Sequence, residues 1–350
     1  MPMQEADFFP DIADLDNPQL QAELQAVNDA KTKPLGSLGR LEELALQLGR
    51  ILGTTRPVLV QPQMVVCAGD HGLVKRGVSA YPQDVTWQMV ENFLADGAAV
   101  SVMARQHGIA LTVVDCGVAH DFAPRHRLQV RKIAHGTQDC LDGPAMTHEQ
   151  CLQAIRNGME LVQALPGNVL MLGEMGIGNT SAATLILTRL LGANLINATG
   201  PGTGLDQAGM QRKLDVLQQV LDAHPQAVQP LEVLAAFGGF EIATMVGALL
   251  QAAADRRVIL VDGVIVSSAL LVASRLEPLV LQRCVYAHRS GEPGHQLILD
   301  ALHARPLLDW GMRLGEGSGA VIAWPLLESA CVMLRDMASF SSAGVAEKSA

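Results

Sequence analysis

Two glutamates stand in glycine-rich segments where a single carboxylate could act as an acid or a base. Glu316 lies within residues 313–320, with glycines at 315, 317 and 319, directly before an apolar stretch at residues 320–334. Glycines permit tight turns and close approach of a ligand, and Ser318 is expected to cap the helix that follows. The alternative interpretation is structural, because an acid at a helix start also complements the helix dipole.

Glu174 lies in a second segment of this kind, residues 173–181, which follows an apolar run and opens an alanine-rich stretch. The segment lacks the lysine of an ATP-binding P-loop and the third glycine of the dinucleotide fingerprint. A plain glycine turn after a strand is the alternative interpretation. Four of its residues are candidates to hold a phosphate at a helix N-terminus: Gly176, Gly178, Asn179 and Thr180.

A third glycine-rich run, residues 199–205, precedes the helical stretch that bears Lys213. Gly202 and the Lys213 ammonium are candidates for an anion site, with an ordinary loop and a solvated lysine as the alternative. Two carboxylates beside anion sites are the pattern expected where a positive centre develops on a phosphorylated sugar. One carboxylate then removes a proton from the nucleophile, and the other stabilises an oxocarbenium-like carbon. The ten histidines show no metal-binding spacing, and no serine-nucleophile elbow is present.

These segments follow short apolar runs that predict β-strands. Continuous apolar strands alternating with helical stretches are typical of a parallel sheet covered on both faces, which predicts a doubly wound, Rossmann-like α/β fold. The predicted strands are residues 64–68, 110–114, 169–172, 258–261 and 279–286. Ligands of such sheets bind at the carboxyl ends of the strands. The motifs at those ends are residues 69–72, 115–117, 173–176, 262–263 and 288–291.

The first part of the chain departs from this alternation. Asn17-Pro18 is a good helix start, and apolar residues at helical spacing follow the turn at residues 34–37. The first 55 or so residues are therefore predicted to form a pair of helices.

Composition places the chain among globular proteins. Its 350 residues are 49% hydrophobic, and 35 acidic against 25 basic residues give a net charge of −10, with no basic run for nucleic acid. Six cysteines without a C-x-x-C pair are expected to be reduced thiols in the cytoplasm. The acidic first 16 residues do not form a secretory signal. The longest apolar runs, 242–254 and 258–273, are too short to predict a membrane span.

Five segments together resemble one family, the nicotinate-nucleotide:dimethylbenzimidazole phosphoribosyltransferases of cobalamin lower-ligand synthesis. The segments are KPLGSLGRLE at 33–42, DHG at 70–72, GEMGIGNT at 173–180, DG at 262–263 and RLGEGSG at 313–319. They span almost the whole chain in the family's order. The resemblance implies that 5,6-dimethylbenzimidazole attacks the anomeric carbon of nicotinate mononucleotide, so that α-ribazole 5′-phosphate forms with inversion and nicotinate leaves.

The same resemblance implies roles for individual residues. Glu316 is the general base that takes the benzimidazole proton, and Glu174 is the second acid of the site. Tyr81 and Met89 stand where some members have a serine and a glutamine facing the aromatic base, so a different base can be accepted; Met89 as a core residue is the alternative. The residues implied to bind the ribose phosphate are Gly176, Lys213, Gly263 and Ser290. The other implied substrate-binding residues are Gly178, Asn179, Thr180, Gly202, Gly291, Leu314 and Gly315.

The resemblance further implies a homodimer that uses no metal and no cofactor. It implies a small helical domain from residues 1–60 plus about 330–350, and a large α/β catalytic domain from residues 61–329. The chain is expected to be cytoplasmic, with no nucleic-acid partner and no membrane span. A dinucleotide-binding oxidoreductase stays an alternative, although it needs a complete glycine fingerprint with a ribose-binding acid downstream. A nucleotide- or base-binding module without catalysis is the other, and the presence of both acids argues against it.

Overall fold

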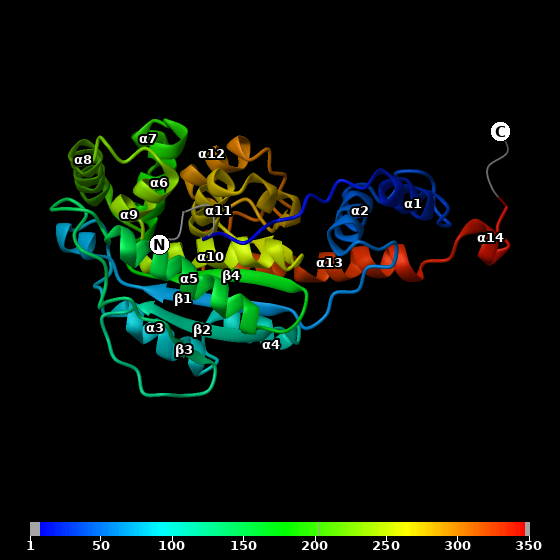
Figure 1. Cartoon of the computed structure of the whole chain (residues 1–350), viewed down its shortest axis with the longest axis horizontal. Helices are drawn as coiled ribbons and strands as arrows, with labels where there is room; N and C mark the ends of the chain where they lie inside the picture. Colours follow the sequence, from blue (N-terminus) through cyan, green and yellow to red (C-terminus); the bar gives the residue numbers. More distant parts are fainter. Residues whose placement is uncertain (1–7, 203, 347–350) are drawn as a thin grey trace.

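The computed structural model describes residues 8–202 and 204–346, and its centre is a six-stranded parallel sheet (Figure 1). The strand order is β3-β2-β1-β4-β5-β6, which is the order of the doubly wound dinucleotide-binding sheets. The strands are β1 (Gln63–Gly69), β2 (Ala110–Gly117), β3 (Leu128–Val130), β4 (Val169–Met175), β5 (Val258–Val261) and β6 (Cys284–Tyr286). The prediction of a doubly wound, Rossmann-like α/β fold is confirmed.

Helices fill the connections between the strands and cover both faces of the sheet (Figure 1). Helix α10 packs along one face, with α5 and α11 against it, and α3, α4 and α13 contact the strands from the other face. Before β4 they are α1 (Pro18–Asp29), α2 (Arg40–Leu52), η2 (Gly72–Arg76), α3 (Val85–Leu94), α4 (Ala99–Gln106) and α5 (His148–Ala164). After β4 they are α6 (Asn179–Leu191), α7 (Leu195–Ala198), α8 (Gln207–Ala223), α9 (Pro230–Phe237), α10 (Phe240–Ala254), α11 (Val264–Leu276), η3 (Pro278–Arg283), α12 (Pro293–Ala301), α13 (Ser318–Asp336) and α14 (Phe340–Ala343).

Strand β1 illustrates why both faces must be covered. Val65 and Cys67 belong to the hydrophobic cluster on one face, whereas Met64, Val66 and Ala68 belong to the cluster on the other. Successive side chains of a strand point to opposite faces, so a continuous apolar run needs a helical layer on each side. All five side chains are completely buried.

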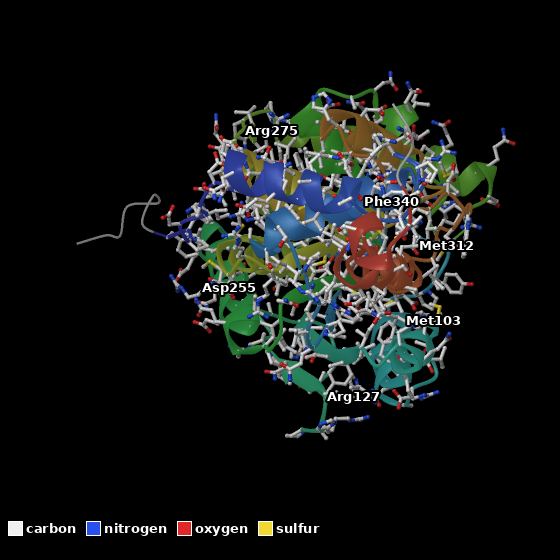
Figure 2. The ribbon with its side chains drawn as sticks, turned by 90° about the vertical axis from the view of Figure 1, so that its right-hand side faces the viewer. Met103, Arg127, Asp255, Arg275, Met312 and Phe340 are labelled. Atoms are coloured by element: carbon white, nitrogen blue, oxygen red, sulfur yellow. The ribbon has the colours of Figure 1, made fainter. Side chains whose placement is uncertain are left out.

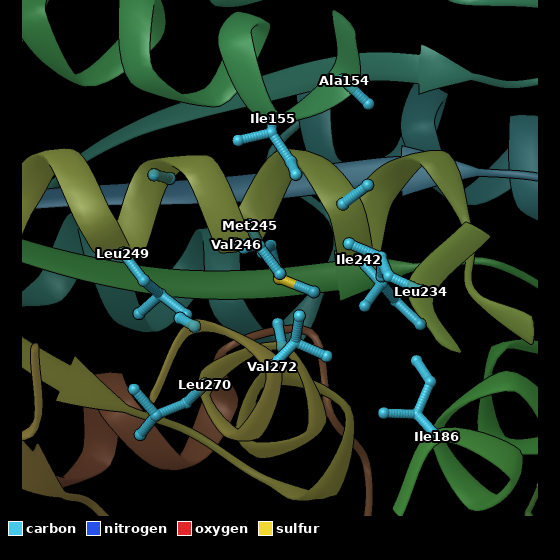
Figure 3. Packing of buried hydrophobic residues seen from close by; sticks show 14 of the residues in the cluster. Ala154, Ile155, Ile186, Leu234, Ile242, Met245, Val246, Leu249, Leu270 and Val272 are labelled. Carbon is cyan, nitrogen blue, oxygen red and sulfur yellow. The ribbon is translucent and has the colours of Figure 1, made fainter. Parts of the chain in front are cut away.

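Helix α10 forms the centre of the larger cluster (Figure 3). Its Ile242, Met245 and Leu249 pack between residues of α5 on one side and of α9 and α11 on the other. Glycines let α5 and α10 meet at close range. A Cβ on Gly158 would lie 1.9 Å from a backbone oxygen of α10, and one on Gly247 would lie 1.8 Å from a backbone oxygen of α5. Neither position accepts a side chain unless a helix moves.

The N-terminal helices and the C-terminal helices lie together at one end of the molecule (Figures 1 and 2). Helix α1 begins as predicted, because the Asn17 side chain accepts a hydrogen bond from the Leu20 N–H (3.0 Å) and Pro18 follows. Helix α2 packs against both α1 and α13, and the Phe340 N–H donates to the Ala30 carbonyl (3.0 Å). The predicted helical pair is confirmed.

The division into two domains stays a prediction. Helix α13 runs from Ser318 to Asp336 without interruption, so the predicted boundary near residue 330 falls inside a helix. Residues 1–7 and 347–350 of the predicted small domain lie outside the described residues.

Helix α13 is the one described helix that is long and apolar enough to cross a membrane, judged by length and composition. Within its 18-residue apolar window, 61% of the residues are buried inside the protein. Its Val321, Trp324 and Leu327 belong to the cluster that covers one face of the sheet. We therefore interpret α13 as a core helix.

Two parts of the strand prediction are wrong. Residues 279–283 belong to the 3₁₀ segment η3, which starts at Pro278, and only Cys284–Tyr286 form a strand. Strand β3 was not predicted, because its residues are partly or fully exposed at the edge of the sheet and carry no continuous apolar signal.

Candidate active site

A cavity of about 690 Å³ opens at the carboxyl ends of β4, β5 and β6, where the sequence predicts ligand binding. The volume is in the usual range for a small-molecule site. Its wall comes from the segments that follow these three strands, from the loop before α13, and from side chains at the start of α3. Three of the five predicted strand-end motifs, at residues 173–176, 262–263 and 288–291, contribute to it.

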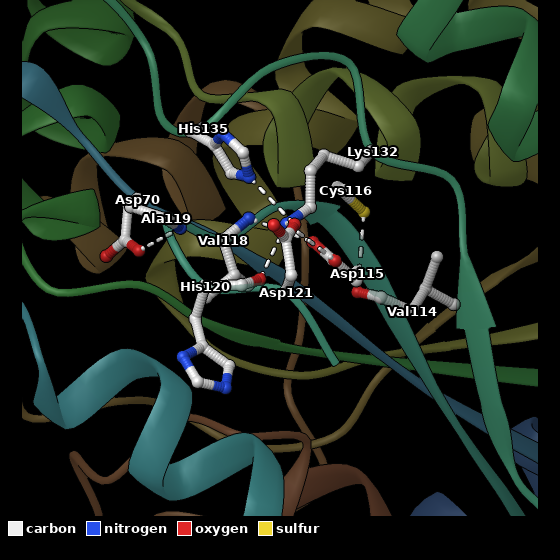
Figure 4. A network of polar contacts seen from close by, with 10 residues as sticks. All are labelled: Asp70, Val114, Asp115, Cys116, Val118, Ala119, His120, Asp121, Lys132 and His135. Atoms are coloured by element: carbon white, nitrogen blue, oxygen red, sulfur yellow. Dashed lines mark hydrogen bonds and ion pairs between the residues drawn. The ribbon is translucent and has the colours of Figure 1, made fainter. Parts of the chain in front are cut away.

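The motif at the end of β2, residues 115–117, has a structural role instead (Figure 4). Asp115 is completely buried, and its Oδ2 lies 3.4 Å from Lys132 Nζ, which also contacts Asp121 (3.1 Å). After β1, Asp70 accepts a hydrogen bond from the Ala119 N–H (2.8 Å). These acids hold the loops after β1 and β2 together, outside the lining of the cavity.

His71, also in the motif after β1, supports the cavity from behind. Its Nε2 forms a 2.7 Å hydrogen bond with Glu241 Oε1, and both side chains are buried. A Cβ on Gly176 would lie 3.4 Å from His71 Nε2, and one on Gly178 would lie 3.4 Å from His71 Cβ. The imidazole therefore packs under the loop between β4 and α6.

Glu174 lies at the end of β4 and is 5% exposed. The side-chain amide of Asn179 donates a hydrogen bond to its Oε2. The backbone N–H of Glu316 donates to its Oε1 (3.2 Å). The two predicted catalytic acids, 142 residues apart in sequence, are thus joined by a hydrogen bond.

Glu316 sits in a turn with three consecutive left-handed residues. The φ angles are +79° at Gly315, +64° at Glu316 and +86° at Gly317. This conformation is unfavourable for a residue with a side chain, so the contacts around it must hold Glu316 in place. Gly173 on β4 allows the close approach, because a Cβ there would lie 2.2 Å from the Glu316 carbonyl oxygen.

Asp262, at the end of β5, caps helix α13. Its Oδ1 accepts a hydrogen bond from the Ala320 N–H (2.9 Å), and its Oδ2 accepts one from the Gly317 N–H (3.2 Å). The expectation that Ser318 caps this helix is wrong: the N-cap position is Gly317, and no side-chain cap hydrogen bond is made there. The first N–H groups of a helix need an acceptor, and an acid on a neighbouring strand supplies it. Asp262 thereby ties the Glu316 loop to the sheet.

Replacing Asp262 with Ala is expected to loosen this loop. Loss of a helix cap costs about 0.5–2 kcal/mol, and displacing a catalytic group by a fraction of an ångström lowers kcat by roughly 10–100-fold. Thermal unfolding and steady-state kinetics of Asp262→Ala and Asp262→Asn check this, because Asn keeps an acceptor oxygen and should have the smaller effect on Tm. An Ala variant with unchanged Tm and kcat would contradict the capping role.

Burial shifts the protonation of the three acids. It raises the pKa of Glu174 to about 8 and that of Glu316 to about 7, and the charge of Asp262 adds to both shifts. Burial also raises the pKa of Asp262, against the influence of His288. Among the described residues, the basic side chain near these acids is His288, whose Nε2 lies 3.6 Å from Asp262 Oδ1. Glu174 and Glu316 titrate near neutral pH and have no lysine or arginine partner within the described part of the chain, which suits proton transfer and a cationic ligand.

The part of the wall at the start of α11 favours an anion. Helix α11 starts at Val264 after Gly263, and its first residues line the cavity. These first N–H groups have no partner within the helix and attract negative charge. Ser290 follows closely, since its Cβ lies 3.9 Å from where a Cβ on Gly263 would be. A phosphate fits at this position.

Most predicted site residues lie in the wall of the cavity: Tyr81, Met89, Glu174, Gly176, Asn179, Thr180, Gly202, Gly263, Ser290, Leu314, Gly315 and Glu316. Gly178 and Gly291 do not. Gly178 is the N-cap of α6 with a φ of +95°, and the Gly291 N–H donates to the Met312 carbonyl (2.9 Å).

Lys213 lies behind the wall. It is 1% exposed, and its Nζ donates hydrogen bonds to the Gly200 carbonyl (3.1 Å) and to Thr180 Oγ1 (3.2 Å). Burial lowers the pKa of Lys213 to about 8, against the attraction of Glu292. Thr180 and Gly202 separate this ammonium from the cavity. The phosphate role of Lys213 stays a prediction.

Side chains from α3 and from the loop before it form the apolar end of the cavity. Tyr81, Val85 and Met89 line it, and Tyr81 is half exposed. Met89 also packs against the hydrophobic cluster of this face. Both interpretations of Met89 therefore hold together, because it belongs to the core and to the wall.

Four polar residues of the wall were not predicted as site residues: Asp262, His288, Glu292 and Arg313. The first three follow β5 or β6, so the strand-end rule was the available signal for them, and Arg313 lies beside Glu316 in the glycine-rich segment. His288 is 2% exposed, and neither ring nitrogen has a hydrogen-bond partner among the described residues. Within residues 8–202 and 204–346, no group of three His, Cys, Asp or Glu side chains is arranged to hold a metal ion.

Comparisons with known proteins place this geometry in context. A family model described as "Phosphoribosyltransferase" matches residues 13–345. The nicotinate-nucleotide–dimethylbenzimidazole phosphoribosyltransferase of Variovorax paradoxus is 64% identical over 340 residues, which cover 97% of each chain. The protein of the same name from Cupriavidus necator is 56% identical over 97% of this chain and 99% of its own. The crystal structure of the Thermus thermophilus protein of that name has a TM-score of 0.90 at 39% identity, and covers 95% of this chain and 100% of that one.

Proposed function

Because the chain belongs to the nicotinate-nucleotide–dimethylbenzimidazole phosphoribosyltransferase family, we propose that it makes the nucleotide of the cobalamin lower ligand. It transfers the phosphoribosyl group of nicotinate mononucleotide to 5,6-dimethylbenzimidazole. The products are α-ribazole 5′-phosphate and nicotinate. This is a pentosyl transfer, so the dinucleotide-binding oxidoreductase is no longer an alternative.

The observation that carries the proposal is that the acids Glu174, Glu316 and Asp262 line the same cavity as the N-terminus of α11. A mononucleotide of nicotinate has a dianionic phosphate and a cationic pyridinium ring. The first N–H groups of α11 complement the phosphate. Glu174 and Glu316 complement the pyridinium and the ribosyl cation that develops as it leaves.

The reaction needs one base and no acid. One ring nitrogen of dimethylbenzimidazole attacks C1′ from the face opposite nicotinate, and the C1′–N bond breaks with its electron pair going to the pyridine nitrogen. The other ring nitrogen loses its proton to Glu316. The leaving ring was a cation and departs neutral, so it needs no proton. Alignment of nitrogen, C1′ and leaving group in the cavity supplies a large part of the acceleration.

The raised pKa values suit this sequence of charges. A bound pyridinium cation favours the ionised forms of Glu174 and Glu316 and lowers the pKa of each. When nicotinate leaves as a neutral ring, that stabilisation ends and Glu316 becomes a stronger base. The proton is therefore accepted most readily as the new C1′–N bond forms.

Replacing Lys213 with Met is expected to weaken binding of the mononucleotide. The loss of a charge near the phosphate should raise the KM for nicotinate mononucleotide by roughly 10–100-fold, with a smaller change in kcat. Arg212→Met is the matched control, because Arg212 neighbours Lys213 but is exposed. Equal KM values for Lys213→Met and wild type would remove Lys213 from the phosphate site.

The apolar end of the cavity is proposed to receive the aromatic base. Tyr81 and Met89 offer an aromatic ring with a phenolic hydroxyl and a thioether there, in place of the serine and glutamine expected from some family members, and Val85 adds an apolar contact. A competition of several benzimidazole, purine and phenolic bases, with products identified by mass, measures the resulting preference.

We also propose that the chain acts as a homodimer in the cytoplasm. Leu35 and Leu38, in the family-specific segment at residues 33–42, are 74% and 41% exposed and offer apolar surface for a second copy. The six cysteines are unpaired thiols, which suits a reducing compartment. Mass photometry of the purified protein gives the number of chains.

The direct test is to incubate the protein with nicotinate mononucleotide and dimethylbenzimidazole. The expected products are free nicotinate and a nucleotide with the mass of α-ribazole 5′-phosphate. Binding of both substrates without any product would favour the non-catalytic binding module.

A further inference from the structure

Glu292 is a buried acid of the cavity wall that the reaction described above does not use. It immediately precedes α12, is 8% exposed and lines the cavity near Ser290. Its Oε1 is buried and has no hydrogen-bond partner within residues 8–202 and 204–346. An unpaired buried carboxylate oxygen costs free energy, so a ligand that donates a hydrogen bond to it is expected.

The glycine-rich loop before α8 fixes this carboxylate. A Cβ on Gly200 would lie 1.9 Å from Glu292 Oε2, so the acid fits only because position 200 is glycine. The carbonyl of the same Gly200 accepts the hydrogen bond of Lys213. Burial raises the pKa of Glu292, and Lys213, Arg313 and a backbone hydrogen bond from Gly202 oppose that shift. The backbone at Gly200 thus lies between the Glu292 carboxylate and the Lys213 ammonium.

Glu292 lies next to the expected phosphate position. Ser290, whose Cβ lies near Gly263 at the start of α11, accepts a hydrogen bond from the Glu292 N–H on its Oγ (3.3 Å). A phosphate dianion carries no hydrogen-bond donor, and a carboxylate repels it. In a ribose 5-phosphate group, the nearby donors are the 2′ and 3′ hydroxyls. Acidic side chains bind ribose hydroxyls in this way in dinucleotide-binding sheets.

Resting on the proposed function, we propose that Glu292 Oε1 accepts a hydrogen bond from a ribose hydroxyl and makes the site select ribose over deoxyribose. Glu292 contacts the sugar away from C1′, so it determines specificity and does not take part in bond exchange. A site built to bond a hydroxyl rejects an analogue that lacks it, because the buried acceptor is left unpaired.

The test compares two variants with wild type on nicotinate mononucleotide and on its 2′-deoxy and 3′-deoxy analogues. Glu292→Leu removes the acceptor oxygen, and Glu292→Gln removes the charge but keeps an acceptor oxygen. Wild type is expected to prefer the ribonucleotide over one of the analogues by roughly 10²–10⁴-fold in kcat/KM. In Glu292→Leu that preference should fall to within about tenfold, mainly through loss of activity on the ribonucleotide, whereas Glu292→Gln should keep most of the preference. Deoxygenation also changes the intrinsic reactivity of the sugar, but this change is the same for every enzyme and cancels in the comparison.

Two controls keep the result interpretable. Glu328→Gln, an exposed glutamate in α13, should leave the preference unchanged. A wild-type rate of Glu292→Leu on the deoxy analogue would show that this variant is folded. If Glu292 served only as a counter-charge to Lys213, each variant would change activity on all three substrates by the same factor, and this outcome overturns the proposal.

Failure of the proposed function is a separate result. Absence of product from wild type with nicotinate mononucleotide would reject the transfer reaction. Equilibrium binding of the ribo- and deoxyribonucleotides by calorimetry, with wild type and Glu292→Leu, then decides the role of Glu292. Equal affinity of wild type for both sugars rejects it.

Discussion

Glu316→Gln is expected to lower kcat for α-ribazole 5′-phosphate formation by about 10²–10⁴-fold, which is the usual contribution of a general base. The amide has the shape of the acid but cannot take the benzimidazole proton. The left-handed turn at 315–317 and its hydrogen bond to Glu174 depend on the backbone, so the fold should be retained. Steady-state kinetics with both substrates saturating measures the effect, and a near-normal rate would reject Glu316 as the base.

The pH dependence separates a lost base from a disturbed site. In wild type, kcat/KM should rise with pH through about 7, as Glu316 loses its proton. The Glu316→Gln variant should lose this limb of the profile. Its thermal unfolding should resemble that of wild type below the ordinary pKa of a glutamate, where Glu316 is protonated in both the folded and the unfolded chain. A variant that is slow only because it is unstable would fail this comparison.

Glu174→Gln is the second change with a large expected effect. It removes the negative charge that faces the developing ribosyl cation, and loss of one such electrostatic contact lowers kcat by roughly 10²–10³-fold. Gln keeps an oxygen to accept the Glu316 N–H, so the loop before α13 should stay in place. Because the two acids are in contact, the effects of Glu174→Gln and Glu316→Gln should not add in the double variant.

Glu174 also links stability to pH. Its folded pKa of about 8 lies above the ordinary glutamate value of 4.5, so the folded state holds the proton more tightly than the unfolded chain. The stability from this protonated acid is fully present below about pH 4.5 and is lost as pH rises through about 8. As pH rises from about 4.5 to about 8, the Tm of Glu174→Gln should therefore fall less than the Tm of wild type. Parallel Tm profiles, together with an unchanged kcat, would contradict the environment assigned to Glu174.

The fold was largely predictable because its signal is local. Uninterrupted apolar runs such as residues 64–68 require burial on both faces, and Asn17-Pro18 marks a helix start by its own chemistry. The wrong predictions concern segments whose local sequence pattern does not match the structure that they adopt. Edge strand β3 has exposed residues and no apolar signal, and Pro278 turns the first part of the last predicted strand into a 3₁₀ segment.

The residues suited to the chemistry could be predicted from the sequence, but their arrangement in space was less predictable. Glycine spacing around Glu174 and Glu316 marked both acids, but the motifs at Asp70 and Asp115 looked equally suitable and proved to lie outside the cavity lining. The difference depends on strand order: residues that follow β4, β5 and β6 line the cavity, whereas the ends of β1 and β2 are joined to each other.

The sheet class, the helical start of the chain and the two glutamates suited to the chemistry were thus readable from the order of the residues. Three features became visible in the folded chain: Asp262 instead of Ser318 caps α13, Glu316 is hydrogen-bonded to Glu174, and burial brings the pKa values of both glutamates near neutrality. The physical reason is that helix formation and strand burial follow from neighbours along the chain. Capping across the sheet, desolvation and charge clustering arise from residues that only folding brings together.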